Sequence, residues 1–316
     1  MAVILHRETR PDLAVGLSQK TLGGAARMLA PILFPRFTVS ERGGTIAVAQ
    51  VLTSNGVKNR AQGDALTGTR AAQTDITYAV AKYEDRALLD DRDIKDHGST
   101  DAAVNAGASI AAYGAMKKVE TDAAAKLFTA ARYAAAGAIE SSSPFAALMD
   151  AADGVKRYGA PHLVCSEAWL NKFVKLPSVA EVLLKLYGDK IIAGVVAGVA
   201  DALKAVGSHF AVVDISIGDN DFWKVGAGTG TDYSDAAAIV GLRPEMATDP
   251  RLTAKMLPVY GFSPVYLPES DSSLDCPFEI QTGYLDSSKD NYVDATLYAD
   301  LCEANAGGAK LVKLPA

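Results

Sequence analysis

The stretch YAVAKYEDRALLDDRD, from Tyr78 to Asp93, decides how this chain is interpreted. It begins with alternating apolar and polar residues, a pattern that predicts a β-strand. It ends in a dense run of mixed charge, in which we expect Asp90-Asp91-Arg92-Asp93 to form a turn. A short polar stretch then leads into a long alanine-rich segment. A strand, a charged turn and a long helix, in that order, organise the rest of the chain around them.

The alanine-rich segment 100–131 predicts one long helix. Ser99 or Thr100 can cap its N-terminus, and small apolar residues recur along it at spacings of three and four. About 32 residues at ~1.5 Å each would span roughly 48 Å. Because the apolar face consists of small side chains, another element can pack closely along it.

A long β-hairpin is predicted on the N-terminal side of this stretch. Residues 45–52 alternate, with Ile46, Val48 and Gln50 on one face, and residues 75–81 form the returning strand. The roughly 20 residues between the strands carry no core pattern, which is uncommon inside a compact domain. We therefore expect the hairpin to project from the body. A projecting hairpin cannot bury its own apolar groups, so it needs a second chain.

The remaining elements predict an α+β fold, because helices and strands are interleaved without regular βαβ units. A helix–strand–helix run occupies 143–187, a further helix 195–206, and strands are predicted at 210–217, 236–242, 278–284 and 292–299. The N-terminal residues 1–40 show no sustained period and carry five basic against two acidic residues.

This order of elements resembles the major capsid proteins of tailed bacteriophages, which have the Hong Kong 97-type capsid fold. The hairpin and the charged turn before the long helix carry the resemblance. So does the segment 162–170, which is similar to the family's strand, Ser-Pro and helix, although Glu167 stands where proline is common. Tyr260-Gly261-Phe262 resembles the family's aromatic–glycine–aromatic turn. The resemblance covers most of the chain.

The resemblance implies four parts. They are an N-terminal arm (1–40), an extended β-hairpin or E-loop (41–86), a peripheral (P) domain with the spine helix and returning strands (87–135 and 265–316), and an axial (A) mixed α/β domain (136–264). It further implies a structural subunit that self-assembles as hexamers and pentamers into an icosahedral head, with the hairpin and arm over neighbouring subunits.

The implied partners are other copies of this chain and the double-stranded DNA that the shell encloses without reading its sequence. A portal and a decoration protein are also implied. Because no long pro-segment precedes the fold, we expect any scaffolding protein to be separate. The implied location is the virion, after assembly in the cytoplasm of the bacterial host, and no cofactor or enzymatic activity is implied.

Charge predicts which surfaces meet in such a shell. The loop 53–73 has three basic residues against one acidic residue, whereas 82–96 has six acidic against four basic residues. We therefore expect the hairpin loop of one subunit to meet the acidic run of a neighbour. The candidate contact residues, with two from the arm, are Arg7, Arg10, Lys58, Arg60, Arg70, Glu84, Asp85, Asp90, Asp91, Arg92 and Asp93. Lys58 is also the possible donor of a crosslink of the kind some relatives form.

No pattern in the chain predicts a catalytic, cofactor or metal site. The glycine-rich run 226–230 lacks both the G-x-G-x-x-G spacing and a Walker lysine. His162 and Cys165 fall on opposite faces of one predicted strand, and the four histidines lack metal-ligand spacing. The cluster at 90–93 lacks the glycine and distal glutamate of an EF-hand, so a salt-bridged surface is the better interpretation.

Composition limits the remaining classes. The 316 residues carry a net charge of −6 and three widely spaced cysteines, which fits neither a basic nucleic-acid binder nor a disulfide framework. No apolar run is long enough for a membrane helix. The alternatives are an encapsulin-type nanocompartment shell protein, which shares the fold, an α/β enzyme of unknown chemistry, and a tail or scaffolding component.

Overall fold

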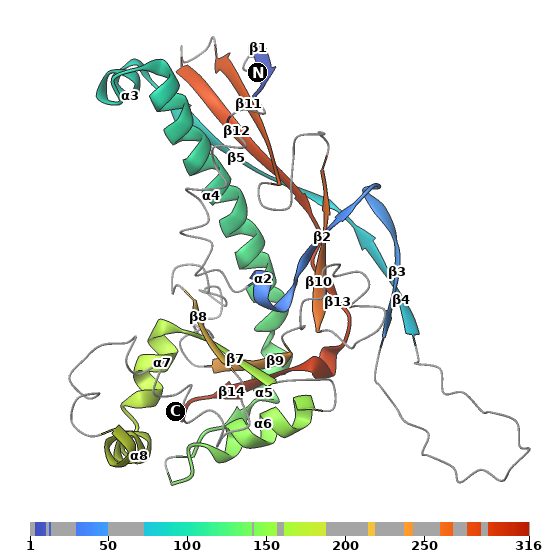
Figure 1. Cartoon of the computed structure of the whole chain (residues 1–316), viewed down its shortest axis with the longest axis vertical. Helices are drawn as coiled ribbons and strands as arrows, with labels where there is room; N and C mark the ends of the chain where they lie inside the picture. The colour runs from blue at the N-terminus through green and yellow to red at the C-terminus, as the bar shows by residue number, and fades with distance from the viewer. Residues whose placement is uncertain are drawn as a thin grey trace, which may run out of the picture.

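Two β-sheets and one long helix make up the body of the molecule (Figure 1). The computed structural model describes residues 4–10, 13, 30–49, 73–140, 142–156, 161–187, 214–218, 237–242, 260–267, 277–285 and 290–315. The hairpin loop, the helix predicted at 195–206 and the glycine-rich run 226–230 lie outside these residues. Among the described helices, none is long and apolar enough to cross a membrane.

The larger sheet has seven strands, and β12 (Asp290–Ala299) lies at its centre. β12 pairs antiparallel with β11 (Phe278–Leu285) on one edge and with β5 (Ala81–Leu89) on the other. The remaining strands extend from these: β1 (Ile4–Thr9) pairs with β11, β10 (Gly261–Tyr266) with the end of β12, and β2 (Arg36–Val39) and β13 (Cys302–Glu303) with β10. The strands predicted at 278–284 and 292–299 are confirmed.

β5 contains the first half of the charged run. Tyr83, Ala87 and Leu89 are buried, whereas the charged side chains Glu84, Asp85 and Arg86 between them are exposed. The predicted strand that begins this stretch therefore continues through the charged residues as far as Leu89. Tyr260-Gly261-Phe262 likewise leads into a strand, β10, where the sequence predicted a turn.

The sequence predicted a turn at Asp90–Asp93, but this segment is the start of helix α3 (Asp91–Asp96). Asp90 is the N-cap, because its carboxylate accepts hydrogen bonds from the backbone N–H groups of Arg92 and Asp93, both at 2.8 Å. The Asp93 carboxylate accepts in return from the Asp90 N–H at 3.1 Å, which completes a capping box. Gly98, with φ of +78°, then turns the chain into the spine helix.

The spine helix α4 (Thr100–Leu127) packs on β5 and β12 through its small residues. Ser99 caps it by accepting from the Ala102 N–H at 3.2 Å. The close approach is visible at Gly107, where an added Cβ would lie 3.2 Å from Leu89 and 3.3 Å from Val293. The expectation of close packing along this helix is therefore confirmed.

The helix ends earlier than the predicted residue 131. Phe128 leaves the helical conformation, with φ of −97° and ψ of 55°. Thr129 then caps a separate short helix, α5 (Ala130–Ala134), by accepting from the Arg132 N–H at 3.3 Å. The alanine pattern continues through the break, so only the cap marks the end of α4.

The second sheet lies at the far end of the spine helix and has the strand order β6 (Gly137–Ala138), β14 (Ala309–Lys313), β9 (Ala237–Leu242), β7 (Pro161–Ser166) and β8 (Asp214–Gly218). Helix α6 (Ala146–Lys156) packs against β14 and β9, while α7 (Glu167–Val174) and α8 (Pro177–Tyr187) follow β7. A 3₁₀ turn, η2 (Ala306–Gly308), precedes β14. The predicted helix–strand–helix run at 143–187 is confirmed.

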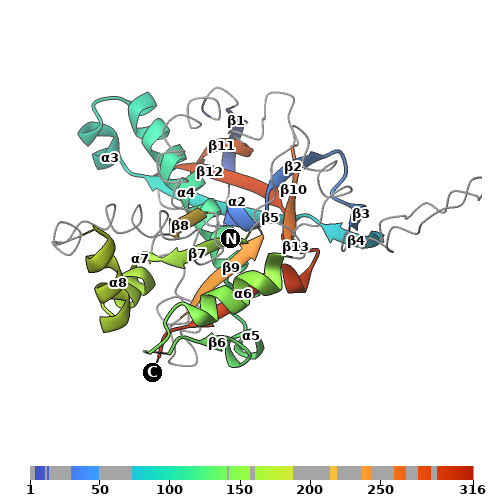
Figure 2. The same ribbon diagram turned by 60° about the horizontal axis from the view of Figure 1, so that its bottom comes forward.

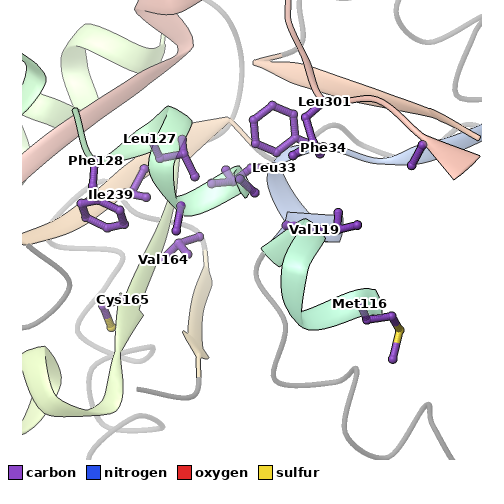
Figure 3. Packing of buried hydrophobic residues seen from close by; sticks show 14 of the residues in the cluster. Leu33, Phe34, Met116, Val119, Leu127, Phe128, Val164, Cys165, Ile239 and Leu301 are labelled. Atoms are coloured by element: carbon purple, nitrogen blue, oxygen red, sulfur yellow. The ribbon is translucent and has the colours of Figure 1, made fainter. Parts of the chain in front are cut away.

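The two sheets share one apolar core, which Figure 3 shows at the end of the spine helix. Leu127 and Phe128 lie there beside Val164 of β7 and Ile239 of β9. Leu33 of the short helix α2 (Ala30–Leu33) joins them and is fully buried. The body is therefore continuous from one sheet to the other.

The hairpin is a separate two-stranded sheet of β3 (Gly43–Ala49) and β4 (Gln73–Ala79), and it stands to one side of the body (Figures 1 and 2). Ile46 and Val48 share its buried face, as predicted. They pack in a cluster with Phe37 and Phe262 of the body. The described stem of the hairpin thus buries its apolar face against its own chain, contrary to the expectation that a second chain is needed there.

The strand pairing of several segments does not follow the four-part division that the resemblance implies. In residues 1–40, β1 and β2 both pair with strands of the seven-stranded sheet in the same chain. Residues 81–86, assigned to the hairpin, belong to β5, and β14, assigned to the peripheral domain, lies in the second sheet. The division into four parts remains a prediction.

Candidate subunit-contact residues

Part of the charged run has a partner inside its own chain. Lys82 and Glu84, two apart on the exposed face of β5, form an ion pair of 2.8 Å between Nζ and Oε2. Both side chains are roughly one-third or more exposed, so this pair contributes little to stability. Glu84 is therefore accessible, but part of its charge is already balanced.

Arg86 makes the strongest contact of the run. Its guanidinium donates to both carboxylate oxygens of Asp294 on β12, at 2.6 and 2.7 Å, and lies 4.2 Å from the centre of the Tyr292 ring. The Asp294 side chain is 1% exposed, whereas Arg86 is 38% exposed. The hydrogen bond with Asp294 is the main cause that raises the pKa of Arg86. Asp294 could not be recognised as the partner of Arg86 from sequence, because the two residues are 208 positions apart.

Asp85 is exposed, and its carboxylate lies beside the spine helix at Gly114. A Cβ added at Gly114 would stand only 1.7 Å from the Asp85 Oδ2. Gly114 therefore provides the space that the Asp85 carboxylate occupies. Any substitution at Gly114 would move this carboxylate, which is still solvent-exposed, away from α4.

On α3, the acidic residues serve the helix itself. Hydrogen bonds from the Asp93 and Arg92 backbone lower the pKa of the Asp90 carboxyl. Arg92 is exposed on this helix, and Asp91 forms its first residue. Asp90 and Asp93 bind one another's backbone, so they are not directed at a cation. Among the described residues, no group of three or more His, Cys, Asp or Glu side chains could hold a metal ion.

Of the other predicted contact residues, Arg7 and Arg10 lie among the described residues. Arg7 is on β1 opposite Gly283, and the Arg10 N–H donates to the Ile280 carbonyl at 2.9 Å. Lys58, Arg60 and Arg70 lie outside the described residues. The pairing of the hairpin loop with the acidic run therefore remains a prediction.

Sequence reasoning also missed a buried carboxylate on the alanine face of the spine helix. Glu120 is 1% exposed, and both of its oxygens accept from the Ala30 N–H, at 3.1 and 2.9 Å. Burial lowers the pKa of the nearby Arg36, and the Glu120 charge opposes this effect. A lone glutamate among alanines was the signal available in the sequence. The Glu120 carboxylate fixes residues 30–36 to α4.

The candidate nucleophile of the sequence is not activated. His162 and Cys165 are both buried on β7. Burial raises the pKa of the Cys165 thiol to about 12, which is the opposite of the lowered pKa that a reactive thiolate needs. The structural interpretation of these two residues remains a prediction.

Known proteins resemble this chain in structure but not in sequence. No protein-family model and no curated protein matches it. A phage-related protein from Bordetella bronchiseptica has a similar structure, with a TM-score of 0.62 and 16% identity over 98% of this chain and 97% of that one. The capsid structure of cyanophage P-SCSP1u has a TM-score of 0.52 and 13% identity, covering 91% and 88% of the two chains.

The virus-like particle from Pyrococcus furiosus is similar to the same degree, with a TM-score of 0.51 and 12% identity over 96% of this chain and 98% of that one. Each likeness spans nearly the whole of both chains, so the entire architecture is shared and not one domain of it. The chain therefore has the fold of phage capsid subunits. The predicted α+β, Hong Kong 97-type fold class is confirmed.

Proposed function

We propose that this protein is the structural subunit of a phage head, which self-assembles as hexamers and pentamers into an icosahedral shell around double-stranded DNA. The observation that carries the proposal is the likeness to a cyanophage capsid chain, which covers 91% of this chain and 88% of that one. The proposed role is structural rather than enzymatic. The proposed location is the virion, after assembly in the host cytoplasm, with a separate scaffolding protein, a portal and a decoration protein as proposed partners.

The physical basis of the proposal is the shape of the subunit. A ring of identical subunits needs a heterologous contact, in which one surface of each copy meets a different surface of the next. The hairpin on one side of the body and the charged face of β5 on the sheet provide two such different surfaces. Because the proposed shell wall is mildly acidic, it would only weakly repel the DNA that it encloses.

Electron microscopy of the purified full chain tests this proposal, with the chain expressed alone and with its genomic neighbours. We expect closed polyhedral particles, or rings of capsomer size that close when the scaffolding protein is present. A chain that remains monomeric in both cultures would overturn the proposal.

The predicted contact between the hairpin loop and the acidic run has its own test. We expect the double variant Arg60→Glu and Arg70→Glu to lose at least about tenfold in particle yield while its thermal unfolding is unchanged, because like charges would then meet across the contact. The matched control is Lys118→Glu with Lys175→Glu, two exposed lysines outside the hairpin. Normal particles from the Arg60 and Arg70 variant would disprove the contact.

A second candidate is an encapsulin-type nanocompartment, because the likeness to the Pyrococcus furiosus particle is as high as that to the cyanophage capsid. The content of particles purified from the native context separates the two functions. Double-stranded DNA protected from nuclease supports the phage head. A protein cargo without DNA supports the nanocompartment.

A further inference from the structure

The hairpin joins the body at one narrow junction. β3 and β4 pair with each other, and the described part of the chain contains no ladder between them and the seven-stranded sheet. The chain leaves β4 at Ala79 and enters β5 at Ala81, so Val80 is the single residue between the two sheets. Because no continuous ladder fixes the direction of the hairpin, that direction depends on the apolar cluster that contains Ile46 and Val48 and on the polar contacts around Val80.

Asp300 lies beside this junction, directly after β12. Its Oδ2 accepts from the Ala79 N–H at 2.9 Å and from the Cys302 Sγ at 3.4 Å, and its Oδ1 accepts from the Leu301 N–H at 2.7 Å. Burial, together with the Asp300 charge, raises the pKa of the Cys302 thiol to about 12, which keeps the thiol protonated as a donor. One carboxylate thus joins the end of β4 to the end of the central strand.

Arg42 holds the other strand of the hairpin. Its guanidinium carbon lies 4.6 Å from the centre of the Tyr298 ring on β12 and 5.1 Å from that of Tyr266 on β10. Its backbone carbonyl accepts from the Val80 N–H at 2.8 Å. Arg42 therefore binds the junction residue and two strands of the body at once.

We propose that Asp300 and Arg42 form a brace that sets the direction of the hairpin in the free subunit, before a second copy binds. Both are positioning residues: neither is placed in a subunit contact, and each acts through the backbone of residues 79–80. A hairpin held in one direction loses less conformational freedom on binding, so the brace favours association. This consequence for assembly rests on the proposed function, whereas the direction of the hairpin in the monomer does not.

Hydrogen exchange in the full-length monomer tests the brace. We expect Asp300→Ala and Arg42→Ala each to speed exchange in the peptide covering 73–80 at least about tenfold, while exchange in the α4 peptide stays unchanged. Arg42 is exposed, so its variant keeps the proposal testable even where Asp300→Ala fails to fold. The matched control is Asp290→Ala at the opposite end of β12, which we expect to leave 73–80 unchanged. If hydrogen exchange were accelerated equally in the α4 peptide, or not accelerated in the peptide covering 73–80, the brace would be overturned.

A distance measurement shows whether direction itself is lost. Spin labels attached through a keto amino acid at Thr74 of β4 and Lys118 of α4 leave the native cysteines untouched, and both positions are exposed. We expect a clearly broader distance distribution in Asp300→Ala and Arg42→Ala than in the wild type. An unchanged distribution would overturn the proposal, because a purely stabilising role would not require a change in direction.

Assembly kinetics then separate the brace from the proposed function. Where the wild type forms particles, we expect both variants to form them at least about tenfold more slowly. Equal rates would show that hairpin direction does not limit assembly. A wild type that never assembles would instead reject the proposed function, and the exchange and distance results would still decide the brace.

Discussion

The central strand β12 and the hairpin β3–β4 are held in different ways. β12 is paired on both edges and is buried from Tyr292 to Ala299. The hairpin has one ladder and one apolar cluster, and polar contacts at its base fix it to the body. A strand paired on both edges opens only when the whole sheet opens, whereas a two-stranded unit can open by itself. The body is therefore expected to open as one unit, whereas the hairpin can open independently of the body.

The packing follows the same division. Along the spine helix, alanine and glycine allow β5 and β12 to approach closely, so the contact is long and consists mainly of small apolar side chains. At the hairpin base, the contacts are hydrogen bonds and an arginine stacked on tyrosine rings. Such contacts fix a direction while adding less stability than a buried core does.

The largest expected effect is in the body, at the pair between Arg86 and Asp294. We expect Arg86→Met to lower the free energy of unfolding by about 3 kcal/mol, because it leaves the buried Asp294 carboxylate without its charged partner. Chemical denaturation measures this loss. The control, Lys82→Met, breaks an exposed pair on the same strand and should cost less than about 0.5 kcal/mol. Equal losses in the two variants would contradict the special role of β12.

A matched pair of valines compares the two regions directly. Val293 on β12 and Val48 on β3 are both 0% exposed, so Val→Ala removes the same buried groups from each. We expect Val293→Ala to lower the global free energy of unfolding by about 2 kcal/mol and Val48→Ala by less than about 1 kcal/mol. The Val48 variant should instead show faster local exchange in residues 43–49. If both variants lower global stability equally, the hairpin unfolds together with the body and the comparison fails.

The smallest expected effect is at the cap of α3. The pKa of Asp90 is lowered in the folded protein, so its contribution is present above the unfolded pKa of about 3.9 and is lost as pH falls through the lower folded value. NMR shifts of the Arg92 and Asp93 amides between about pH 6 and about pH 2 should titrate with a midpoint below about 3.9. Asp90→Ala should abolish this titration without affecting the hairpin or β12. A midpoint at or above the unfolded value would show that the cap does not form in solution.

Much of the architecture followed from local patterns in the sequence. Alternation located the hairpin strands, with Ile46 and Val48 on one face, and the strands near the C-terminus. The spacing of small residues and a serine cap located the start of the spine helix. These features are visible in sequence because each depends on residues a few positions apart. Their interleaved order predicted the α+β class, whereas the Hong Kong 97-type fold was implied by the resemblance to a known family.

Tertiary structure decided what the charges do. The run from Glu84 to Asp93 is visible in the sequence. The sequence does not show that Arg86 pairs with Asp294 or that Asp85 faces Gly114. Nor does it show that Asp90 and Asp93 cap a helix. The end of α4 and the junction at Asp300 were equally hidden. An ion pair across 208 positions, or a hydrogen bond from Ala79 to a carboxylate 221 positions away, leaves no periodic trace in the chain. Local pattern fixes which element forms, whereas the partner of a polar side chain depends on which distant strands the fold brings together.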